Sequence, residues 1–204
     1  MRNATRLLGL AALVAGSISC GDVVRDSRSP VFLALDLLTA ASGASTTFGT
    51  ILHSDVQVLV RTPDPCTATS PCPTLFADLG EATFRILPKD TVGLASPTTN
   101  NEVTITRFHV SYRRADGRNV QGVDVPFAFD GALTATVRVG TTVTVGFEIV
   151  RHVAKEESPL VQLINSRTII TTIADVTFYG TDRVGNAVSA TGTIQIDFGN
   201  FGDS

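Results

Sequence analysis

Tryptophan is absent from this chain of 204 residues, methionine occurs once, and only two of the 16 basic residues are lysines. The net charge is −3, and no basic cluster is longer than Arg113-Arg114. A nucleic-acid partner requires a basic stripe, so the charge pattern argues against this class of partner. The residues present in quantity are Val, Ile, Thr and Phe, a composition typical of β-strands.

Catalytic signatures are missing as well. The sequence contains no G-x-S-x-G elbow, no S-x-x-K, no H-E-x-x-H and no Walker loop. The three histidines are far apart in sequence, and the alternation around His109 places it on the outer face of a strand. We therefore expect neither an enzyme nor a cofactor or metal site, with a hydrolase that uses scattered carboxylates as the alternative. These carboxylates are Asp116, Asp124, Asp130, Glu156 and Glu157.

The first 20 residues have the three parts of a secretory signal. Arg2 and Arg6 give a basic start, residues 7–18 form a 12-residue apolar stretch, and Ser19 is a small residue at its exit. The apolar stretch is shorter than the roughly 20 residues that a membrane-spanning helix needs. A short buried helix of the fold is the alternative interpretation.

The end of this leader, Gly16-Ser17-Ile18-Ser19-Cys20, resembles a bacterial lipobox. The resemblance implies that the Cys20 thiol carries a diacylglycerol, that the signal peptide 1–19 is removed, and that residues 20–30 form a lipidated tether. Two or three acyl chains hold a protein stably on a membrane, where one chain holds it only marginally. Ser17 departs from the family pattern, which has Leu, Val or Ile there, so plain secretion stays an alternative. Gly21 favours the outer over the inner membrane, because Asp at that position resembles an inner-membrane retention signal.

Cys66 and Cys72 are the other two cysteines, and no thiol is left over once Cys20 is lipidated. An exported protein meets an oxidising compartment, where paired cysteines form disulfides. A bridge between these two would close a small loop and stabilise the fold by roughly 2 kcal/mol. A redox or metal pair is the alternative, but the C-x5-C spacing differs from C-x2-C and no histidine lies nearby in sequence.

From residue 31 to residue 198, hydrophobic side chains fall mainly at every second position, the pattern of strands with one buried face. It predicts about nine strands in one domain, residues 31–204, with a bulge near Arg107 where the phase shifts by one. Segments 31–37 and 56–61 are interpreted as strands, the first with a helix as the alternative. Segments 133–139 and 143–149, joined by a turn at Gly140, are interpreted as a hairpin. Ser158-Pro159 predicts the start of one short crossover helix.

The run Thr181-Asp182-Arg183-Val184-Gly185-Asn186, followed by an alternating last strand, resembles the closing hairpin of bacterial immunoglobulin-like domains. The resemblance implies an all-β fold, an immunoglobulin-like antiparallel β-sandwich. In such a turn Asp accepts backbone N–H bonds and Gly-Asn tolerates positive φ. Calcium sites at Asp182 with Asn186, or at Asp116 with Asp124, are the alternative to simple turn formation. The match covers about 20 residues and supports the fold more than any function.

Tyr179 is the candidate ligand contact, because the alternation points it outward and Tyr112 is the only other tyrosine. The leading hypothesis is a non-catalytic, lipid-anchored module of the bacterial cell envelope that gives structure or contacts an envelope protein or glycan. The alternative is a periplasmic or surface protein that binds a small ligand or glycan. That alternative predicts a concave patch around the Pro-, Thr- and Asn-rich segments 63–81 and 88–101, which are expected as loops at the ends of the sandwich.

Overall fold

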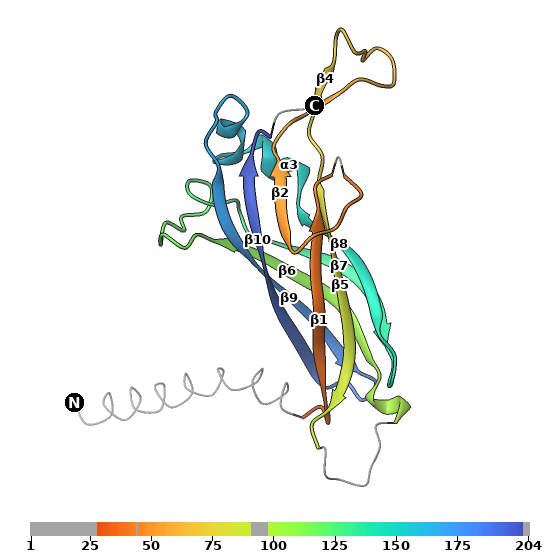
Figure 1. Cartoon of the computed structure of the whole chain (residues 1–204). Helices are drawn as coiled ribbons and strands as arrows, with labels where there is room; N and C mark the ends of the chain where they lie inside the picture. The colour runs from red at the N-terminus through yellow and green to blue at the C-terminus, as the bar shows by residue number, and fades with distance from the viewer. Residues whose placement is uncertain (1–27, 44, 91–97, 202–204) are drawn as a thin grey trace, which may run out of the picture.

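Two stacked sheets form an all-β sandwich in the computed structural model, which describes residues 28–43, 45–90 and 98–201 (Figure 1). One sheet has the order β1 (Val31–Ala41), β5 (Asp78–Pro88) and β8 (Val143–Val150). The other has the order β2 (Ile51–Asp55), β10 (Ala187–Gly199), β9 (Ile170–Asp182), β6 (Val103–Arg113) and β7 (Phe129–Val137). The predicted fold class is confirmed, and the first segment is a strand, as expected.

The core lies between the two sheets, and phenylalanines join them across it. Phe178 of the five-stranded sheet packs edge-on against Phe84 and Phe147 of the three-stranded sheet, with ring centroids 4.8 and 5.2 Å apart. Phe108 of β6 contacts the Phe147 ring at 5.1 Å. Edge-to-face pairs of this kind add about 0.5–1.5 kcal/mol each beyond the apolar area they bury. The Tyr112 hydroxyl also crosses the sandwich, donating to the Ile149 carbonyl at 2.6 Å.

Register shifts interrupt the pairing of the described strands at three places: in β6, in β1, and between Asp78 and Leu79 in the pairing of β5 with β8. The one predicted near Arg107 is confirmed, because the pairing of β6 with both β7 and β9 shifts between Ile105 and Arg107. The second lies in β1 between Leu35 and Leu37, where the sequence predicts none. It turns Leu37 outward, 50% exposed, and brings Leu38 into the core at 9%. The expectation that Leu37 shares the buried face of Leu33 is therefore wrong.

The predicted hairpin around Gly140 is also wrong. β7 pairs with β6 in the five-stranded sheet, whereas β8 pairs with β5 in the three-stranded sheet. The turn at Gly140, which has a φ of +75°, carries the chain from one layer to the other. The alternation in both strands is as predicted, but alternation contains no information about which strand lies alongside.

Strand β2 pairs in parallel with β10, which departs from the antiparallel arrangement expected throughout. The predicted strand over 56–61 is also divided. Val56 is buried just after the end of β2, and β3 (Val58–Val60) pairs instead with β4 (Cys72–Thr74) in a separate two-stranded ribbon. The predicted disulfide is confirmed here: Cys66 and Cys72 are bonded, with an S–S length of 2.00 Å. This bridge closes the ribbon that projects from one end of the sandwich (Figure 1).

The crossover from β8 to β9 contains the predicted helical turn and one more. Residues after Pro159 form the 3-10 helix η2 (Leu160–Leu163), whose Leu160 and Leu163 are buried. The short helix α3 (His152–Glu156) precedes it and has no signal in the alternation. A second 3-10 turn, η1 (Thr99–Asn101), leads into β6.

Candidate functional site

Tyr179 lies on the outer face of the five-stranded sheet, as its alternation with the buried Phe178 predicts. In register it faces Arg107 of β6 on one side and Ser189 of β10 on the other. The Arg107 guanidinium lies over the Tyr179 ring, with its carbon 4.1 Å from the centroid. A cation over an exposed aromatic face contributes about 0.5–1 kcal/mol. The tyrosine is therefore half-buried under an arginine rather than presenting an open ring.

A hollow of about 370 Å³ opens beside this pair, lined by Thr106, Arg107, Tyr179, Thr181, Val188 and Ser189, among others. Its hydroxyls and guanidinium are hydrogen-bonding groups, and the tyrosine provides the aromatic surface. Gly180 allows the strands to approach closely at its base, because an added Cβ would lie 2.4 Å from the Thr104 carbonyl oxygen. Such a surface can bind a polar ligand through hydroxyls, although a sugar ring could stack on Tyr179 only after Arg107 moved.

Asp130 of β7 connects this face to the edge of the sheet. Its Oδ1 lies 3.1 Å from Arg107 Nη1 and 3.3 Å from His109 Nδ1. His109 is on the outer face, as predicted. The Arg107 and Asp130 side chains are each about half exposed, so the pair orients Arg107 over the tyrosine and adds little to stability.

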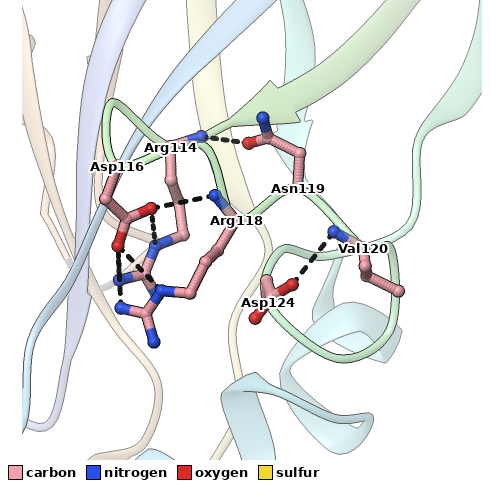
Figure 2. Close-up of polar contacts among 6 residues, drawn as sticks. All are labelled: Arg114, Asp116, Arg118, Asn119, Val120 and Asp124. Atoms are coloured by element: carbon pink, nitrogen blue, oxygen red, sulfur yellow. Dashed lines mark hydrogen bonds and ion pairs between the residues drawn. The ribbon is translucent and has the colours of Figure 1, made fainter.

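The carboxylates of the loop that follows β6 are engaged within that loop (Figure 2). Asp116 accepts hydrogen bonds from the guanidinium groups of Arg114 and Arg118, at 2.6 and 2.7 Å. These bonds hold the pKa of Asp116 well below its usual range. Asp124 accepts the Val120 backbone N–H at 3.1 Å. Each carboxylate therefore has its own partners, and their proposed joint calcium site gains no support.

Glu156 ends α3 and Glu157 is its C-cap, so these two carboxylates lie on the crossover, away from the loop of Asp116 in sequence and element. Across the parts of the chain that the structure describes, no group of three or more His, Cys, Asp or Glu side chains could hold a metal ion.

The turn between β9 and β10 is organised by Asp182. Its Oδ1 accepts the backbone N–H groups of Val184 and Asn186 at 3.0 and 2.8 Å, and its Oδ2 accepts the Asn186 side-chain amide at 2.8 Å. Gly185 has a φ of +90°, a conformation that favours glycine. The groups that suggested a calcium site thus satisfy one another, and the hairpin that they close is as predicted.

We expect Asp182→Asn to lower the free energy of unfolding by about 1–2 kcal/mol at pH 7. Burial raises the pKa of Asp182, but hydrogen bonds from Asn186, Ser29 and Val184 outweigh it and leave the pKa below its ordinary value. A depressed pKa in the folded state stabilises the fold above the unfolded value, about 3.9, and this contribution is lost as the pH falls through the folded value. Denaturant unfolding at pH 7 and pH 3 measures the difference.

The difference in the free energy of unfolding between wild type and Asp182→Asn should therefore be smaller at pH 3 than at pH 7. Asp64→Asn is the matched control, because it makes the same chemical change in the loop that precedes the disulfide. An equal difference in the free energy of unfolding at both pH values would contradict a stabilising role for the Asp182 charge.

A buried ionic cluster is the feature that sequence analysis missed. Lys155 Nζ lies 2.8 Å from Asp78 Oδ1 and donates to the Asp55 carbonyl at 2.7 Å. Asp78 also accepts from the Ser54 hydroxyl at 2.5 Å and from the Gly43 N–H at 2.9 Å. Burial raises the pKa of Asp78, although Lys155 and the hydrogen bonds act in the opposite direction. The only sequence signal is the rarity of lysine, since Asp78 and Lys155 are 77 positions apart.

This cluster does not form an open site. The side chains of Asp78 and Lys155 are 0% and 1% exposed, and Ser54 is 0% exposed. A substrate could not reach the Ser54 hydroxyl without opening the fold. The contacts of Lys155 instead connect α3 to the ends of β2 and β5, so the cluster has a structural role.

The two loop segments of the expected concave patch lie apart. Segment 63–81 precedes and enters β5, whereas segment 88–101 follows it. Residues 72–74, 78–81 and 88 lie in strands rather than in the expected loops. The rest of β5 separates the two segments, whose described parts lie at opposite ends of the sandwich (Figure 1). The patch that the small-ligand hypothesis predicts from both segments together is therefore not formed.

Cys20 and the leader lie outside the described residues. Within the described part of the chain, none of the helices has the length and apolar character needed to cross a bilayer.

Because comparison with known proteins gives no match, the chain is classified by its fold alone. No protein-family model matches the chain, and no curated protein matches it. The structure defines an all-β sandwich with a polar hollow around Tyr179 on its five-stranded face.

Proposed function

We propose that the chain is an exported bacterial lipoprotein whose immunoglobulin-like sandwich is a non-catalytic module, and that the Tyr179 face contacts a partner in the cell envelope. The observation that carries the contact is the hollow beside Tyr179 and Arg107, where hydroxyl, guanidinium and aromatic groups meet on an exposed sheet. Export is supported by the leader and by the Cys66–Cys72 disulfide, which is typical of an oxidising compartment.

The chemistry of the described residues favours a module over an enzyme. The densest cluster of reactive groups, Ser54, Asp78 and Lys155, is sealed inside the fold. Asp116 and Asp130 of the hydrolase alternative are held in ion pairs with arginines. A glycan is the second candidate partner, favoured by the Thr181 and Ser189 hydroxyls around the Tyr179 hollow.

The lipid anchor is tested by intact-mass spectrometry and membrane fractionation of the protein from bacterial cells. Cys20→Ala is expected to abolish the added acyl mass and to leave the protein unprocessed or soluble. The matched control is the double variant Cys66→Ala/Cys72→Ala, which loses the disulfide but should keep the lipid. A Cys20→Ala protein that retains the acyl mass would overturn the anchor.

The contact face is tested separately by in-cell photo-crosslinking from a reactive amino acid placed at Thr181, beside the hollow. We expect a discrete adduct that disappears when Tyr179→Ala and Arg107→Ala are combined. The same probe at Thr144, on the outer face of β8 in the other sheet, is the control. An adduct removed by a glycan hydrolase identifies the glycan candidate, and equal labelling from both probe positions would reject the Tyr179 face.

A further inference from the structure

A second hollow, of about 280 Å³, lies where the edges of the two sheets meet. β7 is the last strand of the five-stranded sheet and β8 is the last strand of the three-stranded sheet. Because these strands pair with different neighbours, the sandwich is open between them and the core reaches the surface. The volume is close to the lower end of the range for small-ligand pockets, about 300 Å³.

The floor of this hollow is aromatic. Phe108, Phe129 and Phe147 line it, and the Phe108 ring contacts the other two edge-on at 6.1 and 5.1 Å. Phe108 lies directly across from Gly131 of β7, and Phe147 lies directly across from Gly80 of β5. The missing side chains leave room for the rings, which fill that space and are only 4–8% exposed, so the ring edges form the apolar part of the floor.

Arg151 is the unexplained group in the hollow. Its Nε is buried and has no hydrogen-bond partner, and it is the single buried side-chain nitrogen or oxygen of this kind among the described residues. The guanidinium lies over the Phe129 ring, 4.5 Å from its centroid. A buried donor without an acceptor has lost its hydrogen bonds to water without replacing them, so such a donor in a native structure calls for an explanation.

The chemistry of a guanidinium indicates what would complete the site. Its donors form a planar fork that matches the two oxygens of a carboxylate. The rim of the hollow carries two carboxylates of its own, Asp130 and Glu148. Their negative charge disfavours a multiply charged anion such as phosphate, and it is compatible with a ligand that has a single carboxylate.

We infer that this hollow binds a small monocarboxylate with an apolar or aromatic body, the carboxylate on Arg151 and the body against Phe108 and Phe147. The ligand is about the size of one amino acid. It can be a simple carboxylic acid or an amino acid whose ammonium group faces Glu148. The inference goes beyond the proposed envelope module, because it involves neither the lipid anchor nor the Tyr179 face.

The test is a titration of the full-length protein, in detergent, followed by NMR, with three probes of similar size: 3-phenylpropionate, L-phenylalanine and phenethylamine. We expect the carboxylates to bind with a Kd in the millimolar range, because ligands of this size make few contacts to offset the cost of association. The amides of Gly131 and Gly146, which line the hollow, should shift on binding. Phenethylamine, which has no carboxylate, should not bind there.

The variants assign the contacts. Arg151→Gln should weaken 3-phenylpropionate binding at least tenfold, and Arg151→Lys should weaken it less, since lysine keeps the charge but lacks the fork. Arg138→Gln, which removes an exposed arginine from the turn after β7, is the control. If the ligand is an amino acid, Glu148→Gln should weaken the binding of L-phenylalanine but not that of 3-phenylpropionate. If the ligand is a simple acid, Glu148→Gln should leave the affinity for both probes unchanged or increase it.

The absence of carboxylate binding to the wild-type protein up to 20 mM would overturn the inference. Binding that survives Arg151→Gln, or phenethylamine binding in preference to the acids, would overturn it as well. The wild-type amide shifts keep the test decisive even if Arg151→Gln fails to fold.

Discussion

Lys155→Met is expected to lower the free energy of unfolding by about 3–5 kcal/mol, the cost of removing one partner from a buried ion pair. The substitution leaves the Asp78 carboxylate inside the fold without its counter-charge, and it removes the hydrogen bond from Lys155 to the Asp55 carbonyl. Methionine has nearly the volume of lysine, so the loss comes from charge rather than from a cavity. Equilibrium unfolding in denaturant at pH 7 measures it.

The pH dependence of this variant separates charge from packing. Without Lys155, only the hydrogen bonds from Ser54 and Gly43 oppose the effect of burial, so the folded pKa of Asp78 rises further above the unfolded value. The stability of the variant therefore falls as the pH rises through this interval. The penalty of Lys155→Met should therefore be smaller at pH 4 than at pH 7, because a protonated Asp78 needs no counter-charge.

A double variant supplies the control. Asp78→Leu/Lys155→Met removes both charges and is expected to be more stable than Lys155→Met alone. If Lys155→Met costs less than 1 kcal/mol at pH 7, the cluster is not the structural tie that we describe.

Gly131→Ala is expected to lower the free energy of unfolding by about 2–3 kcal/mol, the range for overpacking a filled core. A Cβ at this position would lie 2.2 Å from Cζ of Phe108, which sits directly across from Gly131. The ring packs against Phe129, Phe147 and Phe178, so any shift that relieves the clash breaks these aromatic contacts. Thermal and denaturant unfolding both report the effect.

Gly146→Ala is the matched control for this clash. Gly146 also lines the hollow between β7 and β8, but an added Cβ there meets nothing within 4 Å. Its replacement should leave stability unchanged or raise it slightly, since alanine restricts the unfolded chain more than glycine does. The second test is the pair Gly131→Ala/Phe108→Leu, which should cost less than the sum of its single changes. Equal effects of Gly131→Ala and Gly146→Ala would rule out the steric argument.

The bulges in β6 and β1 illustrate what sequence patterning can and cannot reveal. In β6 the polar pair Thr106 and Arg107 interrupts the alternation, so the shift of phase is readable from the sequence. In β1 the bulge falls between Leu35 and Leu37, and the two residues after it, Leu37 and Leu38, are both apolar. Either phase then fits the same residue types, and only packing against the opposite sheet selects Leu38 for the core.

The candidate sites divide in the same way. The outward position of Tyr179 follows from its neighbours in β9, whereas the arginine above it depends on the register between β6 and β9. Asp182 and Asn186 meet within one turn, and their motif was recognisable. Asp78 and Lys155 meet only because α3 packs beside the ends of β2 and β5. The residues around Asp78 in the sequence do not indicate that Lys155 is its partner, and those around Lys155 do not indicate Asp78.

The amino-acid sequence by itself determined that the described chain forms strands, which faces of most strands are buried, that β9 and β10 form a closing hairpin, and that Cys66 and Cys72 are positioned to bond. These are local properties, because side chains alternate along an extended strand and a short turn depends on its own residues. Only the tertiary structure decided that β7 and β8 belong to different sheets, that β2 runs parallel to β10, and that Arg151 faces an open aromatic hollow. Those outcomes depend on how the two sheets stack. Contacts between segments that are distant in the sequence cannot be predicted from the local hydrophobic pattern of either segment.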